Sequence, residues 1–93
     1  MNARVSIVMP VHNAEGLVAD SVASVQAQTM EDWELLIVDD ASVDESVAQI
    51  ARVIDKDNRI SLTRLPQNAG AAVARNTAIG EVSGRYIAFC DSD

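Results

Sequence analysis

Cysteine and histidine are almost absent from this chain, which has one residue of each, Cys90 and His12, among 93 residues. A single cysteine excludes a disulfide within the chain. The two residues together are too few for the His and Cys clusters that hold zinc. Any metal ion bound here must therefore be held by oxygen ligands, which suit Mg²⁺ and Mn²⁺.

Basic residues and long apolar runs are also scarce. Seven Lys and Arg against fourteen Asp and Glu leave a net charge of −7, and the basic residues are scattered, whereas nucleic-acid binding needs a basic patch. Apolar runs such as Leu35–Val38 fall far short of the roughly 20 residues of a membrane-spanning helix. We therefore expect a soluble, cytoplasmic chain that has no membrane segment and binds no nucleic acid.

A glycine-rich phosphate loop is missing as well. A Rossmann dehydrogenase needs Gly-x-Gly-x-x-Gly after its first strand, and the corresponding segment here is Pro10–Gly16. A dinucleotide-dependent dehydrogenase is therefore a poor interpretation.

Four short segments have the apolar, β-branched or alternating character of strands. Pro10 is expected to end the first, and the alternation in the third suits a place near a sheet edge. Trp33 and Phe89 are expected in the core, and Cys90 is expected to be a small buried residue. The predicted strands are Val5–Met9, Trp33–Val38, Ile60–Thr63 and Tyr86–Cys90.

Helices are predicted between these strands. Apolar residues recur at helical spacing after Glu15, which would lie near the N-terminus of the first helix. Ser42 and Glu45 have the spacing of a capping box, so the second helix is expected to begin there, and Gly80 is expected to cap the third. The residues that define the helices are Val18, Val22 and Val25 in the first, Val43, Val47, Ile50, Ala51 and Ile54 in the second, and Gly70–Ile79 in the third.

This alternation predicts a single α/β domain over residues 1–93, without repeats or linkers. Right-handed crossovers give three layers around a parallel sheet of order 3-2-1-4 with flanking helices, a Rossmann-like architecture. The strand order reverses between the first and fourth strands, and ligands of such sheets bind outside the carboxyl ends of the strands at this reversal.

Polar residues follow three of the predicted strands at this edge, which we call the carboxyl rim. They are Pro10–Asn13 after the first strand, Asp39 and Asp40 after the second, and Asp91–Asp93 after the fourth. Their carboxylates would repel one another unless a cation or hydrogen-bond donors compensate. An Asp-x-Asp directly after a strand suits Mg²⁺ or Mn²⁺ carrying substrate phosphates, although surface turn aspartates have the same spacing.

The pair Asp39 and Asp40 has two interpretations. Aspartates before a helix can cap it, or they can face the rim and bind donors such as a base N–H or ribose hydroxyls. Because Ser42 supplies the expected cap, we favour the second. Arg75 is the basic residue best placed to face the rim, and His12 is expected to be a turn residue.

Several short segments look like the family 2 glycosyltransferases of the GT-A fold, and together they span the chain. The resemblance implies transfer of a sugar from a nucleotide diphosphate donor, commonly UDP-linked, to an acceptor hydroxyl with inversion, aided by Mn²⁺ or Mg²⁺. The segments are Val5–Asn13, Gln28–Thr29, Trp33–Glu34, Val38–Asp44, Asn68–Gly70, Ala74–Asn76 and Asp91–Asp93.

The resemblance also implies a nucleotide-sugar site. Asp40 would accept the uracil N–H, with Asp39 and Glu15 as supports. Arg75 would approach the base or a phosphate. The residues along the base would be Pro10, Val11, His12 and Asn13.

The Asp-x-Asp would serve the other end of the donor. Asp93 would coordinate the metal ion beneath the diphosphate, and Asp91 would lie toward the ribose and the metal, with Ser92 between them. In the family, the general base, the acceptor site and the last strands follow this motif. We therefore expect a truncated half-domain, inactive in transfer but with weak nucleotide affinity, whose uncovered fourth strand promotes self-association.

Two other interpretations are non-enzymatic. A receiver-type signalling module also gathers aspartates at strand ends to bind Mg²⁺ and accept phosphate, but its acidic pair follows the first strand. A scaffold or interaction domain with a vestigial pocket would show no response to nucleotide.

Overall fold

Strands and helices alternate along the chain in the order that the sequence predicts. The computed structural model describes residues 4–27 and 32–90. The strands are β1 Val5–Val11, β2 Trp33–Asp39, β3 Ile60–Arg64 and β4 Tyr86–Phe89, and the helices are α1 Val18–Gln26, α2 Ser46–Ile54 and α3 Ala71–Ile79.

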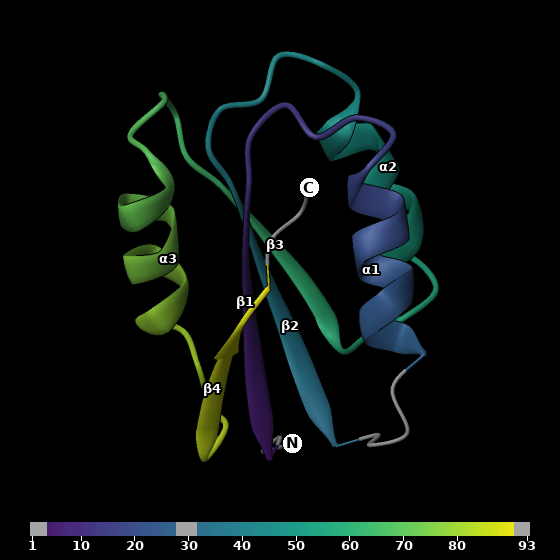
Figure 1. Cartoon of the computed structure of the whole chain (residues 1–93), viewed down its shortest axis with the longest axis vertical. Coiled ribbons are helices and arrows are strands. Elements are labelled where there is room, and N and C mark those ends of the chain that lie inside the picture. The colour runs from purple at the N-terminus through teal and green to yellow at the C-terminus, as the bar shows by residue number, and fades with distance from the viewer. Residues whose placement is uncertain (1–3, 28–31, 91–93) are drawn as a thin grey trace.

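The strands form one parallel sheet of order β3-β2-β1-β4. Helices α1 and α2 cover one face and α3 covers the other (Figure 1). The predicted fold class, a three-layer α/β sheet of order 3-2-1-4, is confirmed, as is the edge position of β3. None of the described helices has the length and apolar character needed to cross a membrane.

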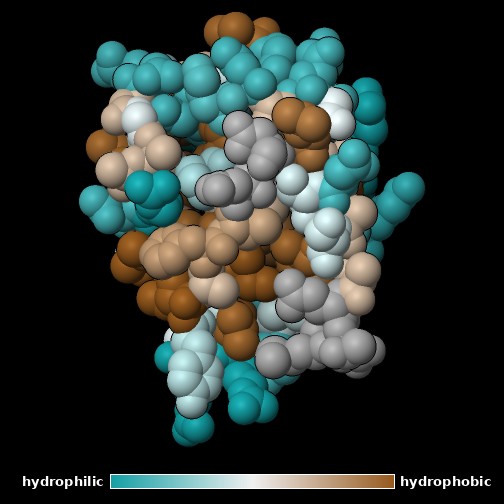
Figure 2. Space-filling model, in the orientation of Figure 1, coloured by the Kyte–Doolittle hydropathy of each residue, from teal (hydrophilic) through white to brown (hydrophobic). Residues whose placement is uncertain are grey.

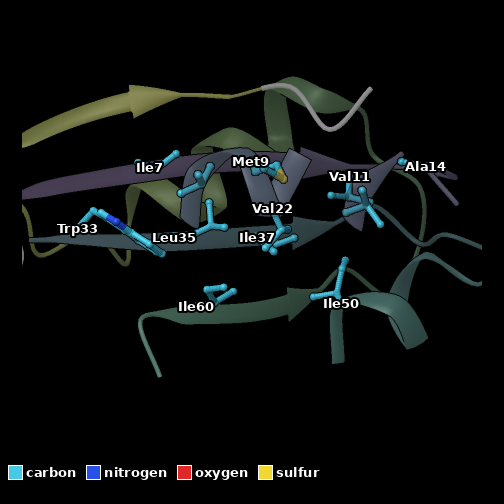
Figure 3. Packing of buried hydrophobic residues seen from close by; sticks show 12 residues of the cluster. Ile7, Met9, Val11, Ala14, Val22, Trp33, Leu35, Ile37, Ile50 and Ile60 are labelled. Carbon is cyan, nitrogen blue, oxygen red and sulfur yellow. The ribbon is translucent and has the colours of Figure 1, made fainter. Parts of the chain in front are cut away.

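The core lies on both faces because neighbouring residues of a strand point to opposite sides. Ile7 and Met9 of β1 lie with Leu35 and Ile37 of β2 under α1 and α2 (Figure 3). On the other face, fully buried alanines of α3 pack against the sheet through a smaller cluster. That cluster is Val8, Leu36, Val38, Ala74 and Ala78.

Trp33 is a core residue, as predicted, with 2% of its surface exposed. The Arg59 guanidinium lies 3.8 Å from the centre of its ring, a cation–π contact. Asp57 holds that guanidinium through Nε and Nη2, both at 2.9 Å. These Arg59 hydrogen bonds, opposed by partial burial, hold the pKa of Asp57 well below its usual range.

The prediction that Pro10 ends the first strand is wrong on one side of β1 only. Toward β2, pairing continues through Pro10 to Val11. Toward β4, pairing ends at Val8 and Phe89, and the Cys90 N–H donates to the Val8 carbonyl. The next donor on that side would be the N–H of Pro10, which proline lacks. The proline therefore ends the β4 ladder and leaves the β2 ladder intact.

The predicted capping box at Ser42 and Glu45 is also wrong. Helix α2 begins at Ser46, and the residue before it, Glu45, makes no side-chain capping bond. The Ser42 hydroxyl cannot cap the helix because it binds Asp39 and the Asn13 N–H instead. Gly80 ends α3 as predicted.

The prediction that Phe89 lies in the core is wrong, because β4 is an edge strand. Phe89 and Tyr86 are each 59% exposed and Ile87 is 43% exposed. Cys90 is half-buried. Behind the strand lies an apolar groove lined by Val5, Ile7, Val25, Trp33, Ala88, Phe89 and Cys90. Apolar surface accordingly gathers over β4 and its flank in Figure 2.

A polar cluster ties β4 to the amino ends of β1 and β2. Glu34 accepts hydrogen bonds from the Ser6 hydroxyl and from the N–H and hydroxyl of Ser83. Burial raises the pKa of Glu34, but these bonds outweigh it and lower the pKa overall. Ser6 Oγ also accepts the Gly84 N–H at 2.8 Å. A Cβ at Gly84 would lie 2.6 Å from that oxygen, so the close approach requires glycine.

Candidate functional site

The tips of β1 and β2 lie side by side at the carboxyl rim. Val11 is level with Asp39 in the sheet register, and the Asp40 N–H donates to the Val11 carbonyl at 2.7 Å. The loops that follow, which begin at His12 and Ala41, are therefore neighbours. The predicted meeting of these two strand ends is confirmed.

His12 connects three segments of the rim. Its Nδ1 lies 2.6 Å from the Asp40 carbonyl oxygen, and because a carbonyl only accepts, Nδ1 carries the proton. Nε2 faces the side-chain amides of Asn13 at 3.3 Å and Asn68 at 3.2 Å, and the Asn68 amide also lies 3.3 Å from Nδ1. His12 is thus more than a turn residue, since it joins the loops after β1, β2 and β3.

Asp40 anchors the start of α3. Its carboxylate accepts the Ala69 N–H at 2.7 Å and the Gly70 N–H at 2.8 Å, and only 3% of the residue is exposed. Gly70 precedes α3 at φ 96°, a backbone conformation that favours glycine. The alternative in which Asp40 caps the second helix is wrong, because its bonds go to the third.

Asp39 supports the loop that follows it. Its carboxylate accepts the Ser42 N–H at 3.0 Å and the Ser42 hydroxyl at 2.5 Å. The side chain is fully buried, and Arg64 Nε lies 3.8 Å from its carboxylate. Asp39 therefore stabilises the rim from behind, whereas Asp40 lies between the loops.

The loop between β1 and α1 is fastened to the segment that enters α2. Each N–H of residues 13–16 donates to a side chain of that segment. The acceptors are Ser42 Oγ at 2.8 Å, Ser46 Oγ at 2.8 Å, Asp44 Oδ2 at 3.1 Å and Gln49 Oε1 at 3.2 Å, taken in order from Asn13 to Gly16.

The same two segments are joined in the opposite direction. Asn13 Oδ1 accepts the Val43 N–H and Glu15 Oε1 accepts the Glu45 N–H, both at 2.9 Å. Glu15 therefore binds a neighbouring loop and not the N-terminus of its own helix. Asn13 and Ala41 have left-handed φ values of 48° and 55°, a cost that surrounding bonds must offset and that is common at functional sites.

Arg75 lies near the middle of α3, the helix that Asp40 anchors, and is half-buried. Its guanidinium has no hydrogen-bond or ion-pair partner among residues 4–27 and 32–90. Asp91, Ser92 and Asp93 lie outside the described residues. Within the described part of the chain, no three His, Cys, Asp or Glu side chains are grouped to hold a metal ion.

Sequence reasoning assigns no part in the site to Ser42, Asp44, Ser46 or Asn68, although it expects Ser42 to cap the second helix. Ser42 and Asp44 lie in the motif segment Val38–Asp44. The density of serine and aspartate in residues 39–46 is a signal that could have found Ser42, Asp44 and Ser46. Asn68 lies in a motif segment but had no assigned role.

The profile of Glycosyl transferase family 2 matches residues 6–93. This chain belongs to glycosyltransferase family 2. The match begins at Ser6, inside β1, and so includes the loops that contain His12, Asp40 and Asn68.

Two related proteins support this assignment. An uncharacterized glycosyltransferase from Haemophilus influenzae is 43% identical over 89 residues, which cover 96% of this chain and 36% of that protein. The UDP-Glc:alpha-D-GlcNAc-diphosphoundecaprenol beta-1,3-glucosyltransferase WfgD from Escherichia coli is 47% identical over 89 residues, covering 96% of this chain and 34% of that protein. This family 2 chain thus spans about a third of the length of these relatives.

Solved structures confirm the GT-A fold. S. aureus TarS 1-349 in complex with UDP-GlcNAc has a TM-score of 0.84 at 26% identity, covering 97% of this chain and 26% of that one. The mannosyltransferase PcManGT from Pyrobaculum calidifontis, solved with GDP-Man and Mn²⁺, has a TM-score of 0.90 at 24% identity and covers 100% of this chain and 28% of that one. Because its identity to this chain is 24%, the likeness to PcManGT supports the fold alone.

Proposed function

We propose that this chain forms the nucleotide-sugar-binding part of a glycosyltransferase that uses a UDP-linked donor. Family membership supports a glycosyltransferase, and two of the proteins similar to this chain are described with UDP-Glc and UDP-GlcNAc. The observation that carries the proposal is the convergence of His12, Asp40 and Asn68 from three different loops at one rim. Membership of this family does not favour the interpretation of the chain as a receiver module or as a scaffold domain.

Asp40 is the residue proposed to recognise the base. Each of its carboxylate oxygens accepts one backbone N–H from the loop before α3 and keeps a further lone pair. The imide N–H of uracil is the complementary donor. Pro10, Val11, His12 and Asn13 would lie along the base, with Asp39 and Glu15 fixing the loops behind them.

Arg75, Asp91, Ser92 and Asp93 are proposed to serve the rest of the donor. An arginine without an ionic partner among the described residues can give a forked pair of hydrogen bonds to phosphate or to a base carbonyl. The two aspartates have the hard oxygen ligands that suit Mn²⁺ or Mg²⁺, with Asp91 also near the ribose. Such a cation would stabilise the negative charge of the departing nucleoside diphosphate.

The overall reaction is proposed to be transfer to an acceptor hydroxyl with inversion. Inversion requires a general base on the face of the sugar opposite the diphosphate, and no residue of this chain is assigned to that role. The chain spans about a third of its relatives, so we propose that alone it binds the donor weakly and does not complete transfer. A cytoplasmic location stays a prediction from composition.

Calorimetric titration of the chain with UDP, with and without Mn²⁺, tests the proposal. We expect UDP binding that Mn²⁺ strengthens, a loss of about tenfold or more in affinity for Asp40→Asn, since a charge-assisted bond is lost, and loss of the Mn²⁺ effect for Asp93→Ala. Asp20→Asn, an exposed carboxylate on α1, is the matched control. A folded chain that binds no UDP at millimolar concentration would support the scaffold interpretation.

Self-association through β4 is proposed as a further property of this chain. Within the described part of the chain the strand has one sheet neighbour, β1. Its sequence has no charged residue or proline, which are the usual protections of an edge. Ile87 and Phe89 direct their backbone groups away from β1, because the groups of Tyr86 and Cys90 pair with it. A second β4 would satisfy them.

A further inference from the structure

Ser42 and Ser46 have the same bonding pattern on the two sides of one loop. Ser42 Oγ accepts the Asn13 N–H at 2.8 Å and donates to Asp39 at 2.5 Å. Ser46 Oγ accepts the Ala14 N–H at 2.8 Å and donates to Asp44 at 2.6 Å. Each serine is therefore a bridge between a loop amide and a carboxylate.

The serine of each bridge is buried. Ser46 is fully buried and Ser42 is 7% exposed. Without the Ser46 hydroxyl, the N–H of the buried Ala14 would lose its acceptor, which is more costly than losing a bond that water replaces. A hydroxyl that donates to a carboxylate also becomes a better acceptor, because successive bonds polarise one another. The hydrogen bond from the Ser46 hydroxyl, followed by those from backbone N–H groups, lowers the pKa of Asp44, which keeps this carboxylate charged.

The two serine bridges hold the backbone of Asn13 and Ala14, in the loop that follows β1 at the carboxyl rim. Asn13 has a left-handed φ of 48°, and its side chain contacts both the Val43 N–H and the His12 ring. His12 in turn donates to the carbonyl of Asp40. A contact path therefore runs from the two buried serines through Asn13 to His12 and Asp40.

We propose that Ser42 and Ser46 are positioning residues for nucleotide recognition. Backed by Asp39 and Asp44, they hold the amides of Asn13 and Ala14 in the conformation that presents His12 and Asn13 to the base. The inference rests on the proposed function, since it concerns the same rim. Ser42 and Ser46 thereby influence which base binds without contacting the base themselves.

The test compares Ser42→Ala and Ser46→Ala with the unchanged chain by calorimetry, using UDP and GDP in the presence of Mn²⁺. We expect each variant to bind UDP about five- to tenfold more weakly, by the loss of about one buried hydrogen bond, and to prefer UDP over GDP less strongly. Ser42→Thr keeps the hydroxyl and should restore affinity. Ser24→Ala, which removes an exposed hydroxyl that donates to the Asp20 carbonyl in α1, is the matched control.

Amide exchange at Asn13 and Ala14, followed by NMR, distinguishes positioning from a purely structural role. Faster exchange at these amides together with weaker UDP binding and reduced selectivity supports the inference. Faster exchange with unchanged UDP affinity and selectivity overturns it. If an alanine variant does not fold, Asp44→Asn removes the negative charge of the group that accepts the Ser46 hydroxyl, without leaving a cavity, and should weaken UDP binding about threefold. Unchanged affinity there also overturns the inference. An unchanged chain that binds no UDP rejects the proposed function, and this inference with it.

Discussion

At the scale of single residues, Gly84 at the amino end of the sheet leaves no room for a side chain. Gly84 packs against Ser6, whose hydroxyl joins the Gly84 N–H to Glu34. This small cluster fixes the entry of β4 beside β1. It is remote from the carboxyl rim, so it contributes to stability and not to ligand binding.

Gly84→Ala is predicted to destabilise the fold by about 1–3 kcal/mol, the usual cost of forcing an extra methyl group into a packed site. The new Cβ would lie 2.6 Å from Ser6 Oγ. Urea unfolding followed by circular dichroism measures the effect. Gly80→Ala is the control, because a Cβ there meets its nearest atom at 3.5 Å and should leave stability unchanged or raised. Equal stability of the two variants would contradict this packing argument.

The lowered pKa of Asp57 predicts how the free energy of unfolding changes with pH. The Arg59 hydrogen bonds lower the pKa of Asp57 in the folded chain, so this contribution is fully present above the unfolded carboxyl pKa of about 3.9 and is lost as pH falls toward the folded value. Asp57→Asn should reduce stability at pH 6 and flatten its decrease between pH 5 and about 2. Urea unfolding across this range checks it, with exposed Asp55→Asn as control. A parallel decrease in both variants would refute the assignment.

At the scale of elements, the sequence predicts the fold well because the two central strands, β1 and β2, are buried on both faces. Continuous apolar runs such as Leu35–Val38 identify central parallel strands, and the alternation with helices then gives the strand order. The misassigned residues lie at element ends. Pro10 ends the hydrogen-bond ladder with β4 but not the ladder with β2. Phe89 lies on β4, whose residues are all exposed. Both outcomes depend on which elements are neighbours in space, and not on the local sequence pattern.

The exposed β4 edge predicts concentration-dependent self-association. Ile87→Lys should shift the chain toward monomer, because a charge on an uncovered strand opposes edge pairing. Sedimentation velocity over a concentration series is the measurement. Val43→Lys is the matched control, since Val43 is also an exposed aliphatic residue, at 90%, and lies in the loop before α2. A chain that is monomeric at high concentration would rule out the proposed edge contact.

At the scale of the whole molecule, parallel topology brings residues distant in the sequence to one rim. The convergence of the β1 and β2 tips was predictable, because carboxyl ends of parallel strands share an edge. The serine bridges were not, since Ser42 and Ser46 bind residues 29 and 32 positions earlier only after the loops are placed. A helix-capping pattern in the sequence therefore turned out to be contacts between loops.

The most direct test of the nucleotide-binding rim is NMR titration of the ¹⁵N-labelled chain with UDP and Mg²⁺. We predict the largest chemical-shift changes at the amides of His12, Asn13, Asp40, Ala69 and Gly70, because their side chains or backbones meet around Asp40. Saturable changes confined to the opposite end of the sheet, near Glu34 and Gly84, or no changes at all in a folded chain, would contradict this account.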